Sequence, residues 1–298
     1  MKIWLSATFF LLFSTFHLSA QGLLDELNDK DSTRKKIKKV KVYDTFAGTR
    51  LINMHTIETY PKHTFVFIIQ HRFGRLNSGF FDLFGLDNGS MRFGFEYAIL
   101  NNLNIGIGRS GYNRTWDAFA KYTFLQQSKG PNQIPLSMSA VASIAIDGRK
   151  KLYADNRPVH FSQRLSFSYQ LLIARKFTRW LSVQLTPSLV HENLVATKAD
   201  KNLLFIMGGG ARFHITPALS ITGEYHYRVL DNPLNAYRNS AGIGVEINTG
   251  GHIFQITLSN SSPMFDPGYL RKTSGNIAKG EIHLGFNITR NWGFGKGN

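Results

Sequence analysis

The stretch between residues 161 and 230 alternates apolar and polar residues in four long runs, and this pattern constrains the fold more than any other feature. The first run separates two faces: Phe161, Leu165, Phe167, Tyr169, Leu171 and Ile173 against Ser162, Arg164, Ser166, Ser168 and Gln170. Strands of about ten residues with one apolar and one polar face are typical of a transmembrane barrel, in which lipid contacts one face and a watery lumen the other. We therefore predict an all-β fold, a single antiparallel transmembrane β-barrel.

Twelve segments after Pro61 show this period-two alternation, so we predict twelve strands. Their predicted ranges are 63–73, 90–99, 102–109, 114–125, 134–147, 161–176, 179–190, 202–215, 217–230, 239–249, 251–260 and 278–289. An even number of strands is what a single-chain bacterial outer-membrane barrel requires.

The connections between the predicted strands alternate in length. Tight links at 100–101, 177–178, 216 and 250 alternate with longer links such as 74–89 and 261–277. The links at 110–113 and 126–133 break the contrast in length but keep the order. Outer-membrane barrels have short periplasmic turns and longer external loops. We therefore predict six external loops, periplasmic termini and a location in the outer membrane of a Gram-negative bacterium.

The inward-facing positions of the predicted strands carry charged side chains, which a watery lumen accommodates and a dry core does not. The outward positions carry aliphatic and aromatic side chains, with aromatic residues near the strand ends, as in interfacial girdles. The predicted lumen-lining residues are Arg92, Glu96, Asp117, Lys121, Arg164, Glu224, His226, Arg228, Glu246, Glu281 and His283.

The amino terminus has the pattern of a secretory signal peptide: Lys2, an apolar run over 3–13, and Leu18-Ser19-Ala20 before Gln21. The apolar run is shorter than the ~20 residues of a transmembrane helix. We predict a cleaved signal peptide over 1–20, a basic periplasmic tether over 21–50 and a barrel domain over 51–298. Residues 51–59 form a strand-like lead-in. A thirteenth strand would make the count odd, so we expect a periplasmic or lumen-inserted segment there.

The formal net charge is +16, and seven basic residues stand against four acidic ones between Gln21 and Val42. The run from Lys30 to Lys41 is interpreted as a solvated tether. In an exported chain, a basic excess favours lipid phosphates, other anionic envelope polymers or a periplasmic protein as partners over nucleic acid. Outer-membrane lipid is the partner that the apolar outward face requires.

The predicted external loop over 74–89 is rich in apolar residues: Phe80, Phe81, Leu83, Phe84 and Leu86. Large apolar patches are costly to leave in water, so we expect this loop to pack inside the barrel mouth or on its rim. Ligand capture by the loop is the alternative.

Motifs for catalysis or metal binding are weak. Residues 106–111 match G-x-G-x-x-G, but a strand pattern follows where a dinucleotide site requires a helix. The chain has no cysteine, and its ten histidines show no metalloenzyme spacing. The pairs Glu224/His226 and Glu281/His283 are interpreted as polar lumen filling rather than zinc ligands. His252 is expected to face outward, without an assignable serine partner for a lipid hydrolase. We predict no enzyme, cofactor or metal.

Several longer motifs are specific: Gly48-Thr49-Arg50-Leu51-Ile52-Asn53, His71-Arg72-Phe73-Gly74, Leu83-Phe84-Gly85-Leu86-Asp87, residues 170–177 (QLLIARKF), Leu189-Val190-His191 and Thr249-Gly250-Gly251-His252. On these motifs the chain resembles an uncharacterised Bacteroidetes-type family of outer-membrane β-barrels that is known only as a domain of unknown function. The resemblance covers nearly all of the chain after the signal peptide. It implies an outer-membrane barrel and no catalytic residues.

Three functions remain open on the sequence. The first is a small-solute conduit or a plugged barrel for envelope transport, since twelve strands lie between the eight that side chains fill and the sixteen that leave a channel. The second is a structural or docking barrel that holds an envelope partner through its loops or its basic tether. The third is a barrel lipid hydrolase.

Overall fold

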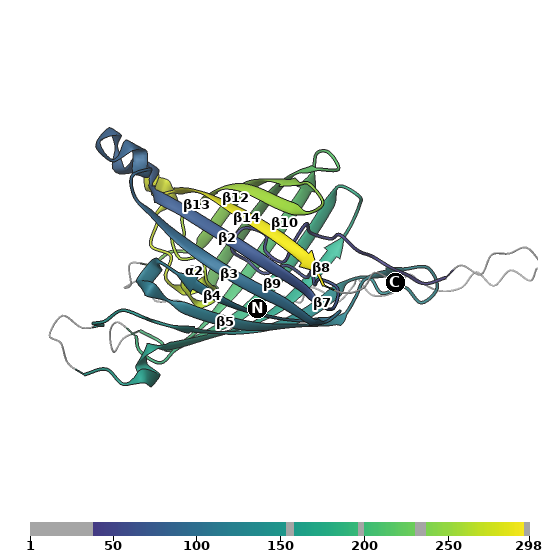
Figure 1. The fold of residues 1–298 in the computed structure, drawn as a ribbon, viewed down its shortest axis with the longest axis horizontal. Helices are drawn as coiled ribbons and strands as arrows, with labels where there is room; N and C mark the ends of the chain where they lie inside the picture. The colour runs from purple at the N-terminus through teal and green to yellow at the C-terminus, as the bar shows by residue number, and fades with distance from the viewer. Residues whose placement is uncertain (1–37, 153–157, 196–199, 230–236, 295–298) are drawn as a thin grey trace, which may run out of the picture. The chain divides into compact units, whose positions relative to one another are not determined.

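Twelve antiparallel strands close into one barrel in the computed structural model, which describes residues 38–152, 158–195, 200–229 and 237–294 (Figure 1). Each strand pairs with the next along the chain, and β14 pairs with β2 to close the ring. Residues from Lys39 onward belong to one compact unit. The predicted signal peptide and most of the predicted tether lie outside the described residues.

The barrel strands are 8 to 12 residues long, as alternation over a membrane-spanning length requires. They are β2 (Thr64–Arg75), β3 (Gly89–Leu100), β4 (Leu103–Ser110), β5 (Trp116–Leu125), β7 (Ser137–Ile146), β8 (Leu165–Lys176), β9 (Leu181–Glu192), β10 (Leu203–His214), β11 (Leu219–Val229), β12 (Ser240–Asn248), β13 (His252–Ser259) and β14 (His283–Gly293).

The predicted fold class and strand number are confirmed, and two strand starts need correction. Residues 161–164 form the 3₁₀ turn η4 (Phe161–Arg164), in which the backbone N–H of His160 donates to Gln163 Oε1 at 2.9 Å. The last strand begins at His283 rather than at residue 278, because η5 (Ile277–Lys279) precedes it. Asn276 caps η5 by accepting from the N–H of Ala278, and Gly280 ends it at φ 70°. Local caps therefore interrupt an alternating sequence pattern.

Successive connections alternate between the two ends of the barrel, which we name the turn end and the loop end. Apart from the β5–β7 connection, those at the turn end are shorter than those at the loop end. The turn end joins β3 to β4, β5 to β7, β8 to β9, β10 to β11 and β12 to β13. The β5–β7 connection there contains β6 (Ser128–Lys129), which pairs with β1 (Val40–Lys41) in a separate two-stranded sheet. The chain thus reaches the barrel at its turn end, where the N–H of Val42 donates to the Gln127 carbonyl at 2.8 Å.

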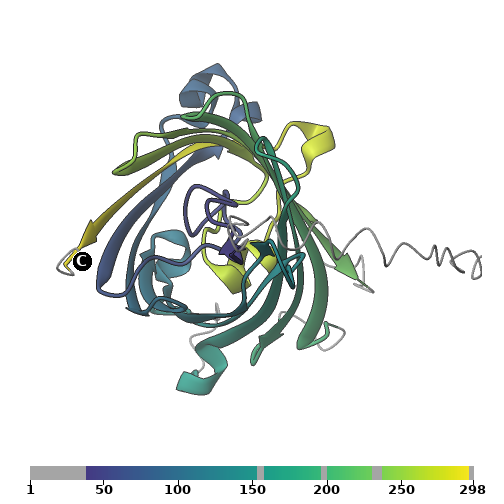
Figure 2. The ribbon, with the colours of Figure 1, turned by 90° about the vertical axis from the view of Figure 1, so that its right-hand side faces the viewer.

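Residues 45–57, named here the lumen segment, lie inside the barrel (Figure 2). Apart from Ala47, every residue of this segment is buried. The segment doubles back on itself: the N–H of Leu51 donates to the Met54 carbonyl and that of Thr56 to the Thr49 carbonyl, both at 2.9 Å. Part of the range predicted as tether therefore belongs to the barrel interior, because residues 45–50 form the first arm of this hairpin.

The short helix α2 (Asp266–Arg271) lies in the β13–β14 connection at the loop end and folds inward. All six of its residues are buried, and it packs against β7, β8 and β9. Among the described residues, no helix is long and apolar enough to span a membrane.

The β2–β3 connection differs from the expectation that it packs into the mouth or against the rim. It contains η1 (Leu76–Ser78) and η2 (Phe80–Gly85), and Phe80 and Phe81 are 80% and 95% exposed. Both figures show it projecting from the ends of β2 and β3, and in Figure 2 it lies outside the ring of strands.

Candidate functional site: the occupied lumen

The lumen wall is lined by polar side chains that the two-residue period of the strands places on one face. Two ion pairs join neighbouring parts of this wall: Arg92 Nε donates to Asp117 Oδ1 at 3.0 Å, and Arg212 Nε lies 2.8 Å from Glu246 Oε1. All four side chains are buried. Within each pair, the two opposite charges neutralise each other inside the wall.

Glu224 on β11 holds the tip of the lumen segment. Its carboxylate accepts the backbone N–H groups of Ile52 at 3.1 Å, Asn53 at 3.0 Å and Met54 at 3.0 Å. Successive backbone N–H groups that converge in this way form an anion-binding nest. A carboxylate suits the site because hydrogen bonds to an ionised acceptor are stronger than those between neutral groups.

Wall amides bind the rest of the lumen segment through its backbone. Gln184 accepts from the N–H of Ile57 at 2.9 Å and donates to the His55 carbonyl at 2.7 Å. Gln255 donates to the Leu51 carbonyl at 2.6 Å, and Asn287 donates to the Ile52 carbonyl at 3.0 Å. An amide can donate and accept at once, so these side chains satisfy a backbone that has left water.

Two buried cations complete the contacts between wall and segment. Lys121 Nζ donates to the Thr56 carbonyl at 3.2 Å and also to the Glu58 carbonyl. Arg72 Nη2 donates to Asn53 Oδ1 at 3.1 Å. On β10, Gly210 makes room for the segment, since a Cβ at this position would lie 2.2 Å from Met54 Cε.

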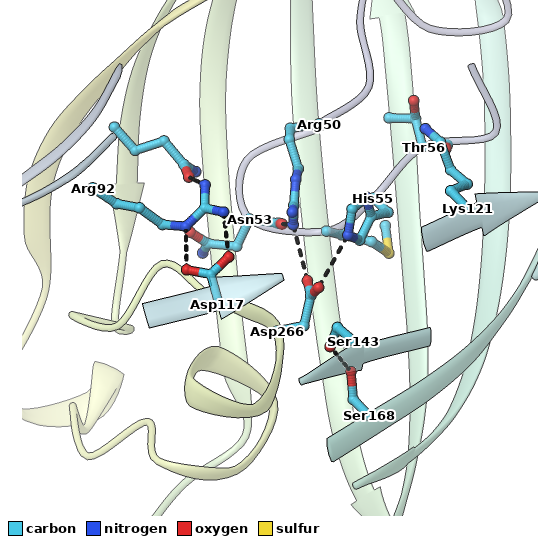
Figure 3. Close-up of polar contacts among 12 residues, drawn as sticks. Arg50, Asn53, His55, Thr56, Arg92, Asp117, Lys121, Ser143, Ser168 and Asp266 are labelled. Carbon is cyan, nitrogen blue, oxygen red and sulfur yellow. Dashed lines mark hydrogen bonds and ion pairs between the residues drawn. The ribbon is translucent and has the colours of Figure 1, made fainter. Parts of the chain in front are cut away.

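Asp266 on α2 joins the two bodies that fill the lumen (Figure 3). Its Oδ1 lies 2.9 Å from Arg50 Nη1, and its Oδ2 lies 3.0 Å from His55 Nε2. A carboxylate paired with arginine can only accept, so His55 Nε2 carries the hydrogen of this bond. We name Arg50, His55 and Asp266 the latch, because it connects a segment that enters at the turn end to a helix that enters at the loop end.

The remainder of α2 is fixed to the wall near the loop end. Arg271 Nε lies 3.1 Å from Glu192 Oε2, and Lys272 Nζ lies 2.8 Å from Glu192 Oε1. Arg228 donates to the Arg271 carbonyl. The buried ring of Tyr269 meets the ring of His226 edge-on, with centroids 5.0 Å apart. Polar and aromatic contacts therefore anchor the part of the helix that follows Asp266.

Nine of the eleven residues predicted to line the lumen lie on barrel strands and are buried: Arg92, Glu96, Asp117, Lys121, Glu224, His226, Arg228, Glu246 and His283. Arg164 instead lies in η4, where its Nη1 donates to the Asp147 carbonyl at 3.0 Å. Glu281 lies in the loop before β14 and pairs with Arg75 at 3.0 Å. The N–H of Asn276 donates to Glu281 and, with Arg75, lowers the pKa of that carboxyl. Both positions have inward parity, but local turns place them beyond the strand.

The residues considered from the sequence for catalysis and metal binding do not come together in one site. His283 Nδ1 lies 2.8 Å from the Phe73 carbonyl, and His226 faces Tyr269, so the two Glu/His pairs have separate surroundings. Within the described ranges, no three His, Cys, Asp or Glu side chains are grouped to hold a metal ion. His252 shares the outer face of β13 with Phe254, against which its ring stacks.

Several lumen residues were not singled out from the sequence. Arg72, Gln184, Gln255 and Asn287 have inward parity on predicted strands, so a search for inward amides as well as charges would have found them. Asp266, Arg50 and His55 lie outside the strands, where parity gives no signal.

A closed antiparallel barrel with an apolar exterior and a polar, filled interior is a transmembrane β-barrel. The chain belongs to the family described as the membrane-bound β-barrel domain (DUF5777), whose model matches residues 46–292. This match confirms the predicted family of membrane barrels of unknown function. It also begins within the lumen segment rather than at the first barrel strand.

Comparison with solved structures finds porins of low sequence identity. The KdgM porin in complex with disordered oligogalacturonate is 9% identical, with a TM-score of 0.45, and 78% of this chain and 99% of that chain are covered. The NanC porin is 6% identical, with a TM-score of 0.46 and coverage of 76% and 97%. The COG4313 outer-membrane channel from Pseudomonas putida F1 is 9% identical, with a TM-score of 0.42 and coverage of 79% and 98%. No curated protein matches the chain.

Proposed function

We propose that this protein is an outer-membrane conduit for small solutes, closed in the present conformation by the lumen segment and α2. Twelve strands enclose more interior than their own side chains fill. Here that interior is occupied by two elements that enter from opposite ends. Displacing both elements would leave a polar passage lined by the wall residues described above.

The latch is the observation that carries this proposal. Asp266 is buried against Arg50 and His55, so the two halves of the closure meet through charges and hydrogen bonds. Buried ion pairs contribute less stability than apolar packing of the same volume, but they can define one of two arrangements. An ionic contact therefore suits a closure that opens better than it suits a permanently filled core.

The test is single-channel conductance of the full-length protein in planar bilayers, with Asp266→Ala compared with the unaltered chain. Breaking a buried ion pair by removing one partner costs about 3–5 kcal/mol. If that cost falls on the closed state, conductance steps that are rare in the unaltered protein become frequent. Glu281→Ala is the matched control, because it removes an ion pair at the loop end outside the lumen.

A variant in which the closure can be locked and released reversibly shows that any change in conductance does not come from misfolding. The chain has no cysteine, so His55→Cys combined with Asp266→Cys introduces the only two thiols. We expect this variant to conduct when reduced and to fall silent when a short bifunctional thiol reagent joins the two positions. A heat-modifiable but silent barrel under both conditions would reject the conduit and support the structural or docking barrel.

A further inference from the structure

The β2–β3 loop exposes a group of apolar side chains that the barrel does not cover. Phe80 and Phe81 are 80% and 95% exposed, and Leu83, Phe84 and Leu86 are 40–50% exposed. Contiguous apolar patches of this kind mark interaction sites on proteins. The patch has no part in closing the lumen, because it lies outside the ring of strands (Figure 2).

The loop is built to hold these rings in place. Leu83 and Phe84 have φ angles of 45° and 54°, which L-residues rarely adopt. The N–H of Phe84 donates to the Gly79 carbonyl at 2.8 Å, and the rings of Phe80 and Phe84 meet edge-on. At the base, a Cβ on Gly85 would lie 2.6 Å from the Arg75 carbonyl oxygen, so only glycine fits. Unfavourable backbone conformations of this kind cluster at functional contacts.

The loop continues the aromatic outer wall of the barrel. On the outward faces of β2, β3 and β14, Phe67 lies against Phe93 and Phe95, and His71 lies against Phe73 and Phe286. Phe73 stands three residues before the loop begins at Leu76. A surface that already contacts lipid therefore leads directly into the exposed rings.

We propose that residues 80–86 insert into the lipid leaflet at the loop end of the barrel and that lipid, rather than protein, covers this patch. Aromatic side chains are favoured where acyl chains meet headgroups. Interfacial elements bury their apolar face about 5–10 Å into this boundary. Asp82 lies between Phe81 and Leu83, and Asp87 follows Leu86. These two carboxylates limit the depth of insertion, since they must remain among the headgroups.

The experiment uses single cysteines in the full chain, labelled with the environment-sensitive fluorophore NBD and reconstituted in phosphatidylcholine vesicles. One cysteine replaces Phe81, and the matched control replaces Lys150, an exposed residue of the β7–β8 loop. We expect the Phe81 probe to emit at shorter wavelength and to be quenched by lipid with a nitroxide near the headgroup. The Lys150 probe should instead be quenched by aqueous iodide.

Two outcomes overturn the proposal. In the first, the Phe81 probe behaves like the Lys150 probe. In the second, its emission shifts only at high protein-to-lipid ratio without nitroxide quenching, which assigns the patch to a second copy of the chain. Phe80→Ser combined with Phe84→Ser, in a heat-modifiable barrel, should reduce nitroxide quenching at position 81. None of these readouts depends on whether the lumen conducts.

Discussion

Irregular backbone inside a barrel needs hydrogen-bond partners from the wall, and Glu224 supplies them at the tip of the lumen segment. The tip of the lumen segment has no strand partner, and its three N–H groups are all satisfied by this carboxylate. Each buried N–H that loses its acceptor costs about 1–3 kcal/mol. Glu224 therefore contributes more hydrogen bonds to the tip than any other wall residue named here.

We predict that Glu224→Ala unseats the tip without opening the wall. A reporter cysteine at Met54, whose side chain is fully buried, should then react faster with a small thiosulfonate reagent. Glu224→Gln retains one acceptor oxygen and should give an intermediate rate. Asp117→Ala is the control, since its ion pair lies within the wall. Equal reaction rates in the Glu224→Ala and Asp117→Ala variants would contradict this role of Glu224.

At the scale of the element, β9 shows how one strand faces lipid and lumen at once. Leu185 is 53% exposed on the outer face, whereas Gln184 beside it is buried and bonded to the lumen segment. A shift of register by one residue would exchange these environments, so the alternation fixes the register. The tight turn to β8 then leaves no freedom for a slip.

We predict that arginine on the outer face of β9 is tolerated according to depth. Leu185→Arg lies near the middle of the strand and should destabilise the barrel by about 2–4 kcal/mol, whereas Leu181→Arg at the strand end should cost about 0–1 kcal/mol. Urea unfolding of the barrel in vesicles measures both free energies. Similar losses for the two variants would mean that β9 does not cross the bilayer as described.

At the scale of the whole molecule, the closure is a three-body arrangement of wall, lumen segment and loop helix. The segment binds the wall mainly through its backbone, and it binds α2 through the side chains of the latch. The lumen segment enters from the turn end and α2 from the loop end. A partner that binds at either face of the membrane could therefore displace one half of the closure. The direction of this arrangement in the membrane is itself a prediction.

We predict that the loop end faces the outside of the cell and the turn end faces the periplasm. Cysteines at Lys150 and Ala278, both exposed at the loop end, should react with an impermeant maleimide on intact cells. A cysteine at Arg179, exposed in the β8–β9 turn, should react only after permeabilisation. The reverse labelling pattern would mean that the barrel has the opposite orientation in the membrane.

The sequence by itself determined the barrel, because alternation with a period of two is a local property of each strand. It indicated twelve strands, and it separated short connections from long ones before any pairing was known. The predicted strand starts at residues 161 and 278 were wrong, because the turns η4 and η5 interrupt an alternating run. Inward charges such as Glu224 followed from the same parity.

Only the tertiary structure decided what fills the lumen. Asp266 lies more than 200 residues from Arg50 in sequence, and their contact depends on two irregular segments that meet inside a closed ring. The same holds for Glu224 and the N–H groups of Ile52, Asn53 and Met54, since backbone groups leave no mark in the residue pattern. The period of a strand fixes which way a side chain points, and the closure of the ring fixes what it meets.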